Sequence, residues 1–358
     1  MNSLPAIVTG ISGGVDSAVA ACLLQKEGYR VAGINIRILD THDENPSLEP
    51  SPLVISDHPD FQIPVFSLNL SMKFFDEVIR YFRNEYLSGR TPNPCMVCNK
   101  TIKWYGLLEG ARMLGAKMIA TGHYARTSFS DGRYRIMKGC DPEKDQSYFL
   151  WMLSQTDLSK TLLPLGTLTK PEVRELARTF GVRAAEKKES QEICFVPNDD
   201  YCSYLKNSIP GLEKQVAGGE IVDVEGKVLG RHRGYPFYTI GQRRGLGISA
   251  PEPLYVTGVD ADHNRILVGR KVDLECRVLT ASGLNWVGIE PPSSAFETAA
   301  RIRYRDRESP CRVEPIGDNE ATVTFETPKY GLTPGQAVVF YRSEEVLGGG
   351  FIGHTHQP

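Results

Sequence analysis

The chain has 358 residues, of which 41% are hydrophobic and 23% charged, and its formal net charge is −2. This composition is typical of a globular protein with two or three domains, and the charge gives no general sign of nucleic-acid binding. No apolar run is long enough to cross a bilayer, and the start MNSLPAIVTG lacks the features of a secretory signal. We therefore expect a cytoplasmic enzyme without a membrane partner, whose eight cysteines are buried, metal-bound or reactive.

Strand and helix patterns alternate through the first half of the chain. Buried strands are predicted at 6–11, 31–38 and 117–121, and helices at 15–28, around 74–82, at 102–114 and at 170–180. A capping box from Thr169 to Glu172 marks the start of the last helix, and residues 46–59 have a loop-like composition. The alternation predicts an α/β fold with a Rossmann-like, mainly parallel sheet covered on both faces.

After about residue 197 the helical periodicity fades, and glycine-rich alternating runs take its place. The segments GEIVDVEGKVLGRH, LYVTGVDADHNRILVGR and ATVTFETPKYGLTPGQAVVFY predict β-hairpins. We expect an α/β domain at 1–197, a small mixed or β domain at 198–272, and a C-terminal β-barrel at 275–358.

The stretch IVTGISGGVDS joins the first strand to the first helix. Because Gly13 and Gly14 have no Cβ, backbone N–H groups there can converge on phosphate oxygens at the positive end of the helix. Ser12 and Ser17 add hydroxyl groups, whereas Asp16 would meet phosphate through a bridging Mg²⁺ ion. For a generic Gly-Gly, a tight strand–helix turn capped by Asp or Ser is the alternative interpretation.

The string SGGVDS resembles the pyrophosphatase-type loop (PP-loop) of enzymes that split ATP between its α- and β-phosphates and adenylate a substrate. It lacks the Gly-Lys-Ser/Thr end of a Walker loop, whose lysine serves transfer at the γ-phosphate. The resemblance therefore implies attack at the α-phosphate, on a substrate that the loop alone does not identify.

Three cysteines stand out by their positions. Cys95 and Cys98 form a C-x-x-C in GRTPNPCMVCNKTIKW, and Cys194 lies in KKESQEICFV. The C-x-x-C alone fits a redox pair, half of a zinc site or two buried cysteines, and no second C-x-x-C completes a four-cysteine site. The other cysteines are expected to be structural, and they are Cys22, Cys140, Cys202, Cys276 and Cys311.

Motifs along the whole chain resemble those of the bacterial tRNA-specific 2-thiouridylase family. They occur in the family's order as GISGGVDS, GRTPNPxxxCNxxIKF (here ending IKW), ATGHYAR, KDQSYFL, ESQxICF, FYTIGQRRGLG and RIRYR. The resemblance implies a PP-loop domain, a small middle domain and a C-terminal β-barrel, with tRNA as substrate and a separate persulfide donor protein as partner.

The resemblance assigns roles residue by residue. ATP would be held by Gly10, Ile11, Ser12, Gly13, Gly14, Val15, Asp16, Ser17, Ile36 and Gly122. Cys98 matches the family's nucleophile, Cys194 matches the persulfide carrier, and Asn93, Pro94 and Cys95 fall where the flipped base is held. Positions implied to contact tRNA are His123, Lys144, Asp145, Gln146, Arg303, Tyr304, Arg305 and Gln336.

The implied chemistry is 2-thiolation of the wobble uridine, U34. Adenylation of the uracil C2 oxygen makes AMP the leaving group, and a persulfide on Cys194 supplies the sulfur, directly or as hydrosulfide. Cys98 then closes a disulfide with Cys194, which a reductant reopens. Thiolates at neutral pH need nearby positive charge, for which Lys100, Lys103, Lys187 and Lys188 are candidates in the sequence.

The chain departs from the family pattern at Cys95, where an aspartate is common. Cys95 either substitutes for that carboxylate or joins Cys98 and Cys194 in holding a [4Fe–4S] cluster with one open iron. A second departure lies between Ile38 and Asp60, where the family has a longer acidic segment with an Asp-Ala motif.

Two basic clusters are candidate RNA surfaces. If residues 301–307 form a strand, the four arginines of RIRYRDR share one face, which anionic RNA or solvent would neutralise. The second cluster lies in the middle domain and consists of Arg231, His232, Arg233, Arg243 and Arg244. A strand-end histidine with a structural role is the alternative for His123.

Two other functions remain open from the residues. An adenylating ligase that passes nitrogen to a small molecule would use the same loop without paired cysteines. An RNA-binding iron–sulfur or zinc module that has lost ATP chemistry would not need Asp16.

Overall fold

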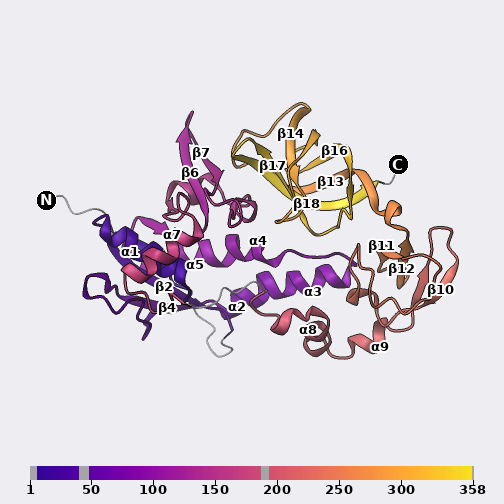
Figure 1. The fold of residues 1–358 in the computed structure, drawn as a ribbon, viewed down its shortest axis with the longest axis horizontal. Coiled ribbons are helices and arrows are strands. Elements are labelled where there is room, and N and C mark those ends of the chain that lie inside the picture. Colours follow the sequence, from indigo (N-terminus) through magenta and orange to yellow (C-terminus); the bar gives the residue numbers. More distant parts are fainter. Residues whose placement is uncertain (1–5, 40–47, 187–192, 357–358) are drawn as a thin grey trace.

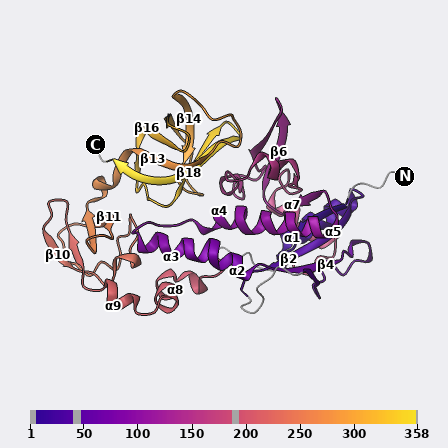
Figure 2. The ribbon, with the colours of Figure 1, turned by 180° about the vertical axis from the view of Figure 1, so that it is seen from behind.

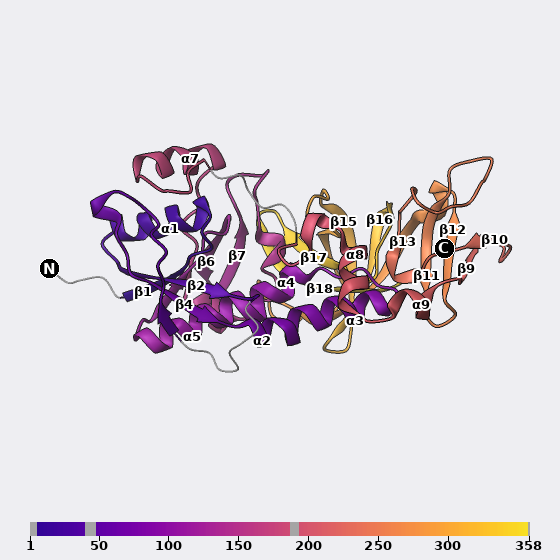
Figure 3. The ribbon, with the colours of Figure 1, turned by 90° about the horizontal axis from the view of Figure 1, so that it is seen from below.

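A computed structural model describes residues 6–39, 48–186 and 193–356 (Figure 1). The α/β region and the middle region lie at opposite ends of an elongated molecule, and the C-terminal barrel lies between them (Figures 1 and 3). Seen from behind, helices α3 and α4 run along the barrel (Figure 2). In the described part of the chain, no helix is long and apolar enough to cross a membrane.

The α/β region is built on a six-stranded sheet with the order β3-β4-β2-β1-β5-β8. Its strands are β1 (Ala6–Gly10), β2 (Arg30–Arg37), β3 (Leu48–Pro50), β4 (Val65–Asn69), β5 (Met118–Ala120) and β8 (Thr161–Leu162). All pair in parallel except β3, an antiparallel edge strand. The predicted parallel sheet is therefore confirmed.

Both faces of this sheet are buried, which explains why its strands have continuous apolar sequences. Ile7 packs in a cluster with α1 (Val15–Lys26) and α7 (Lys170–Thr179), whereas its neighbour Val8 packs in the cluster of α5 (Tyr105–Leu114). Side chains alternate between the faces of a strand, so consecutive residues serve different cores. The region also contains α6 (Gln155–Ser159).

Two helical stretches contain π-helical turns. The first is α2 (Ser71–Phe74), η2 (Phe75–Ile79) and α3 (Arg80–Leu87), and the second is α4 (Pro94–Cys98), η3 (Asn99–Trp104) and α5. The second stretch begins eight residues before the predicted 102–114 helix, because Pro94 occupies the first helical turn, where its fixed φ is favourable. Short 3₁₀ turns occur at 59–61, 147–149, 197–199, 235–237 and 271–274.

The middle region begins with α8 (Tyr201–Ser208) and α9 (Leu212–Val216). Its sheet has the order β10-β9-β12-β11, with β9 (Glu220–Val222), β10 (Val228–Arg231), β11 (Tyr255–Asp260) and β12 (Arg265–Gly269). Two antiparallel hairpins joined by a parallel β9–β12 pairing make this sheet, so both hairpins predicted here are confirmed.

The C-terminal region is a closed six-stranded barrel, as predicted. Its strands are β13 (Glu275–Asn285), β14 (Phe296–Arg301), β15 (Ser309–Ile316), β16 (Glu320–Tyr330), β17 (Ala337–Arg342) and β18 (Glu345–His356). Antiparallel pairing of β13 with β18 closes it. The predicted hairpin within 321–341 is wrong, since β16 pairs with β13 and β15, and β17 with β14 and β18. Barrel closure, and not closeness in the chain, determined these partners.

The predicted strand at 301–307 is also wrong. β14 ends at Arg301, and the chain then bends and turns toward β15. Ile302 is buried and anchors the bend, while Arg301 points back into an ion-pair network. The four arginines therefore do not share one strand face, although Arg303, Arg305 and Arg307 are exposed.

A hairpin that the sequence did not reveal connects the first and last regions. It consists of β6 (Ala125–Ser130) and β7 (Arg133–Lys138). β7 pairs with β18 through Met137 and Ile136, opposite Glu345 and Val346, and so extends the barrel sheet. A hairpin from the α/β region thus belongs to the sheet of the barrel, while the six-stranded parallel sheet is separate. The boundaries at 197 and 275 stay predictions.

Candidate active site

The turn between β1 and α1 fits a phosphate group. Gly14 is the N-cap of α1 in an extended conformation, and Gly13 has a φ of 74°. A Cβ on Gly13 would meet no atom within 4 Å, so the space around it is open. The N–H groups of the first helical turn have no partner within their own helix, and they can donate to an anion there.

Ser12 and Ser17 form hydrogen bonds within the turn. The backbone N–H of Ser12 donates to Ser17 Oγ at 3.2 Å, and Ser17 Oγ donates to the carbonyl of Gly14 at 3.0 Å. Ile11 and Val15 have buried side chains, so they can serve a nucleotide only through their backbone. The hydroxyl of Ser17 therefore shapes the turn.

The other predicted nucleotide residues lie at the same sheet edge. Gly10 ends β1, Ile36 lies near the end of β2, and Gly122 follows β5, and these three strands are neighbours. A Cβ on Gly122 would lie 2.9 Å from the carbonyl carbon of Asp16 and 3.0 Å from Ser17 N. Only glycine fits this close approach. Ligand crevices in open α/β sheets form at this edge.

Asp16 is held by a lysine that sequence reasoning missed. Lys170 Nζ lies 2.6 and 2.8 Å from the two carboxylate oxygens of Asp16, and the Tyr124 hydroxyl donates to Oδ1 at 2.7 Å. The buried Lys170 is the first residue of α7, and its position after Thr169 in the capping box was the available signal. It brings positive charge to the PP-loop from 154 residues away.

A metal site beside Asp16 is poorly supported by its neighbours. The described residues contain no group of three or more His, Cys, Asp or Glu side chains that could hold a metal ion. The carboxylate of Asp16 is instead paired with an ammonium group, as above. Asp16 as a Mg²⁺ ligand stays a prediction.

The three cysteines of interest interact electrostatically. Burial is the main cause of the raised pKa of Cys98, and charge on Cys194 and on Cys95 raises it further. Cys98 is buried on α4, whereas Cys95 and Cys194 are accessible to solvent. All three are free thiols. Phe195, the neighbour of Cys194, lies in the same buried cluster as Met96 and Cys98, so the fold brings Cys194 to the region of α4.

Burial governs the thiol pKa values. Desolvation raises the pKa of Cys98 to about 12. Cys95 and Cys194 keep some exposed surface, but the protein atoms around their thiols still exclude enough water to raise the pKa of both. Lys103, on η3, lowers all three, but less than burial raises them. The expectation of depressed pKa values is thus wrong for this state. Lys100 is paired with Asp157, and Lys187 and Lys188 lie outside the described residues.

The described side chains give the iron–sulfur hypothesis no support. Cys95, Cys98 and Cys194 are all described, and no metal-holding group of three is found among the described side chains. A cluster with three cysteine ligands needs all three sulfurs directed at one centre. The [4Fe–4S] cluster stays a prediction.

His123 lies beside the nucleotide edge and is neutral. Its Nδ1 lies 2.7 Å from Thr121 Oγ1, and its ring is 5.3 Å from that of Trp104. Desolvation first, and then the charge of Lys103, lower the pKa of His123 to about 3. The ring can therefore form hydrogen bonds but carries no charge at neutral pH.

Comparisons with known proteins agree along the whole chain. A family model described as tRNA methyl transferase HUP domain matches residues 5–198. The models for a tRNA methyl transferase PRC-barrel domain and an Aminomethyltransferase beta-barrel domain match 208–270 and 276–352.

Curated relatives share both high identity and full length. Proteins named tRNA-specific 2-thiouridylase MnmA from Chlorobium phaeobacteroides and Chlorobaculum tepidum are 69% and 66% identical, covering 97% and 98% of this chain and 97% and 96% of their own. The Geotalea uraniireducens protein of that name is 50% identical over 99% of this chain and 96% of its own. The chain belongs to the tRNA-specific 2-thiouridylase family.

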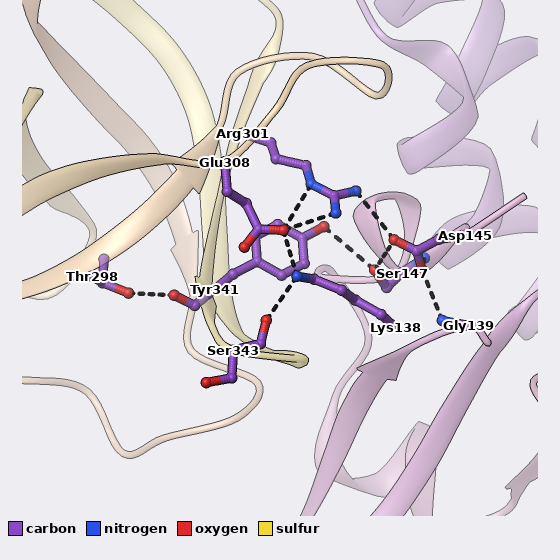
Figure 4. Close-up of polar contacts among 9 residues, drawn as sticks. All are labelled: Lys138, Gly139, Asp145, Ser147, Thr298, Arg301, Glu308, Tyr341 and Ser343. Carbon is purple, nitrogen blue, oxygen red and sulfur yellow. Dashed lines mark hydrogen bonds and ion pairs between the residues drawn. The ribbon is translucent and has the colours of Figure 1, made fainter. Parts of the chain in front are cut away.

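Among the positions predicted to contact tRNA in this thiouridylase-family chain, Asp145 makes its contacts inside the protein. Its buried carboxylate accepts hydrogen bonds from Gly139 N, from Ser147 and from Arg301 Nη1 at 3.1 Å (Figure 4). The neighbouring Gln146 Oε1 accepts from Tyr124 N at 3.0 Å. Both side chains shape the turn at 144–146.

The barrel positions are also engaged with protein. Arg303 Nη2 donates to the carbonyl of Gly331, and the ring of Tyr304 lies 4.6 Å from that of Phe149. Gln336 Nε2 donates to the carbonyls of Thr91 and Pro92. Arg305 remains exposed.

In the middle region, His232 does not belong to the exposed basic cluster that the sequence predicted. His232 is buried, accepts from Gly234 N at 3.0 Å through Nδ1, and contacts the Asn264 carbonyl. Desolvation lowers its pKa. The exposed members are Arg231, Arg233, Arg243 and Arg244.

Proposed function

We propose that the chain is an ATP-dependent tRNA-uridine 2-sulfurtransferase that thiolates C2 of U34. The observation that carries the proposal is that one α/β region holds both an open PP-loop turn and three interacting free thiols. A methyl transferase, as the family-model description reads, requires neither feature. An adenylating ligase requires only the first.

The proposed reaction begins at the PP-loop. The uracil C2 oxygen attacks the α-phosphate of ATP, pyrophosphate leaves, and the C2 oxygen carries AMP. The turn around Gly13 and the ammonium of Lys170 support this step by stabilising the negative charge of the leaving pyrophosphate. Mg²⁺ at Asp16 belongs to the proposal as well.

Sulfur transfer follows at the thiols. A persulfide on Cys194, loaded by a separate donor protein, bonds through its outer sulfur to C2, and AMP leaves with the C2 oxygen. The Cys98 thiolate then attacks the inner sulfur of Cys194, so that the S–S bond breaks and the outer sulfur stays on C2 as the thiocarbonyl. The resulting Cys98–Cys194 disulfide takes two electrons from a thiol reductant to reopen.

The remaining residue roles are part of the same proposal. ATP is assigned to residues 10–17, Ile36 and Gly122, and the flipped base to Asn93, Pro94 and Cys95. The tRNA is assigned to His123, 144–146, 303–305 and Gln336, and the enzyme works in the cytoplasm, where tRNA is found. Positive Arg305 and Arg307 at the barrel rim support these contacts, since phosphate attracts guanidinium groups.

Nucleoside mass spectrometry tests the function. In a deletion strain, wild-type protein should restore 2-thiouridine derivatives in tRNA, while Cys194→Ser should leave them at the level of the deletion strain, because serine cannot carry the persulfide. Cys202→Ser is the matched control. Pyrophosphate release with purified tRNA should persist in Cys194→Ser. Full thiolation by that variant would refute the persulfide role, and an absence of any thiolation by wild type would refute the function.

A further inference from the structure

A loop of the barrel lies on the segment that leads into α4. Residues 331–336 connect β16 to β17, and the backbone N–H of Thr91 donates to the carbonyl of Pro334 at 2.8 Å. A Cβ on Gly335 would lie 2.8 Å from the Thr91 carbonyl oxygen. The two backbones therefore touch, and only glycine permits this distance.

Gln336 makes the most specific contact in this place. Its Nε2 donates to the carbonyl of Thr91 at 3.0 Å and to that of Pro92 at 3.1 Å. Pro92 and Pro94 have no backbone N–H, so the segment cannot order itself through its own ladder of hydrogen bonds. The side-chain amide of a residue 244 positions later supplies the missing donors.

Trp151, a residue of the α/β region that packs against the barrel, makes a second contact with α4. The indole Nε1 of Trp151 donates to the sulfur of Met96, which lies between the two cysteines of the helix. A Cβ on Gly349 would lie 2.8 Å from the Trp151 ring, and the Phe351 ring packs edge-on at 5.4 Å. The start of the segment 91–96 is thus held directly by the barrel, and its end is held by Trp151, which the barrel packs against.

The support is itself fixed to the α/β region. Arg301 joins Asp145 at 3.1 Å and Glu308 at 2.8 Å, and Lys138 joins Glu308 at 2.5 Å (Figure 4). These side chains are largely buried, where ion pairs are screened least. Together with the β7–β18 pairing, they hold the barrel in one orientation.

We propose that Gln336 is a positioning residue that holds the 91–92 segment so that Cys95 and Cys98 face the target base. The barrel is then part of the active site as well as an RNA-binding region. This inference rests on the proposed function for its catalytic meaning, but the hydrogen bonds exist without tRNA. The implied contact of Gln336 with tRNA is the competing role.

The test compares Gln336→Glu with wild type and with Arg305→Gln. Glutamate keeps the shape of glutamine but has no N–H to donate, so the two carbonyls lose their partner. We expect the rate at which iodoacetamide alkylates Cys95 in tRNA-free protein to change several-fold. We also expect kcat for thiolation to fall about 10²-fold with KM for tRNA nearly unchanged. Arg305→Gln should raise KM for tRNA and leave alkylation as in wild type.

Two outcomes would overturn the inference. Unchanged alkylation with a raised KM would make Gln336 a tRNA contact, and unchanged alkylation with unchanged kinetics would leave it no role. Gln336→Met, checked by its melting temperature and near-UV circular dichroism, repeats the test if the glutamate disturbs folding. Alkylation needs neither ATP nor tRNA. It therefore tests whether Gln336 positions the 91–92 segment even if wild-type protein fails to thiolate tRNA.

Discussion

The nucleotide turn and the thiol-bearing helix are built in opposite ways. Residues 10–17 form their turn from neighbouring residues, with distant help from Gly122 and Lys170. The helix α4 is ordered by Trp151 and by the barrel residue Gln336, and Cys194 reaches it from another segment. A phosphate site can thus be formed largely by one stretch of sequence. A thiol site that must accommodate a nucleotide base is assembled from distant segments by the tertiary structure.

The largest effect is expected at Gly122, because the PP-loop turn depends on this distant residue. In Gly122→Ala the new Cβ lies 2.9 Å from the backbone of Asp16, and overpacking of this kind costs about 1–3 kcal/mol. We expect ATP to bind about 10- to 100-fold more weakly by calorimetry. Gly258→Ala, whose Cβ has 3.6 Å to its nearest neighbour, is the control. Equal affinity in both variants would show that the turn tolerates the shift.

The protonation state of Cys98 can be tested through the pH dependence of its alkylation rate. Burial raises the pKa of Cys98 to about 12, so the thiol is protonated at neutral pH. The thiolate fraction, and with it the alkylation rate of Cys98, should rise about tenfold per unit between pH 7 and 9. The unfolded chain, with an ordinary pKa, should level off near pH 9. A plateau below pH 8 in the folded protein would show a thiolate stabilised by charge.

Lys170→Met tests the charge that α7 brings to the PP-loop. Without the ammonium, the Asp16 carboxylate repels the phosphates, and we expect about tenfold weaker ATP binding. The loss stays moderate because Asp16 is 32% exposed and solvent screens it. Lys170→Arg should retain most of the affinity, and exposed Lys160→Met all of it. Asp16→Asn combined with Lys170→Met should recover affinity if repulsion is the cause.

The smallest expected effect is that of Lys103→Met. Lys103 lowers the pKa of Cys95, Cys98 and Cys194, so its removal should slow alkylation of each at pH 8 by about two- to fivefold. Raising the salt concentration should reduce the difference between wild type and variant. Selective slowing of only one thiol would mean that the three do not share this cation.

Predictions that follow from local periodicity agree with the structure, whereas those that depend on contacts with distant residues do not. The parallel sheet, the hairpins of the middle region and the barrel followed from periodicity, because burial of one or both faces imposes it. The strand considered at 301–307 is absent because β14 ends at Arg301, whose side chain turns toward the distant Asp145 and toward Glu308, just before β15. The lowered thiol pKa values failed because burial outweighs a single lysine.

The sequence alone determined the phosphate turn, since its glycines and serines lie within a few residues of one another, and it identified the cysteines as candidate reactive groups. The tertiary structure alone decided that Lys170 neutralises Asp16, that β7 joins the barrel sheet, and that Gln336 holds the segment before α4. The physical reason is that a buried charge or backbone carbonyl needs a hydrogen-bond or ion-pair partner within about 3 Å. The fold determines which residue lies at that distance, however far away it is in the sequence.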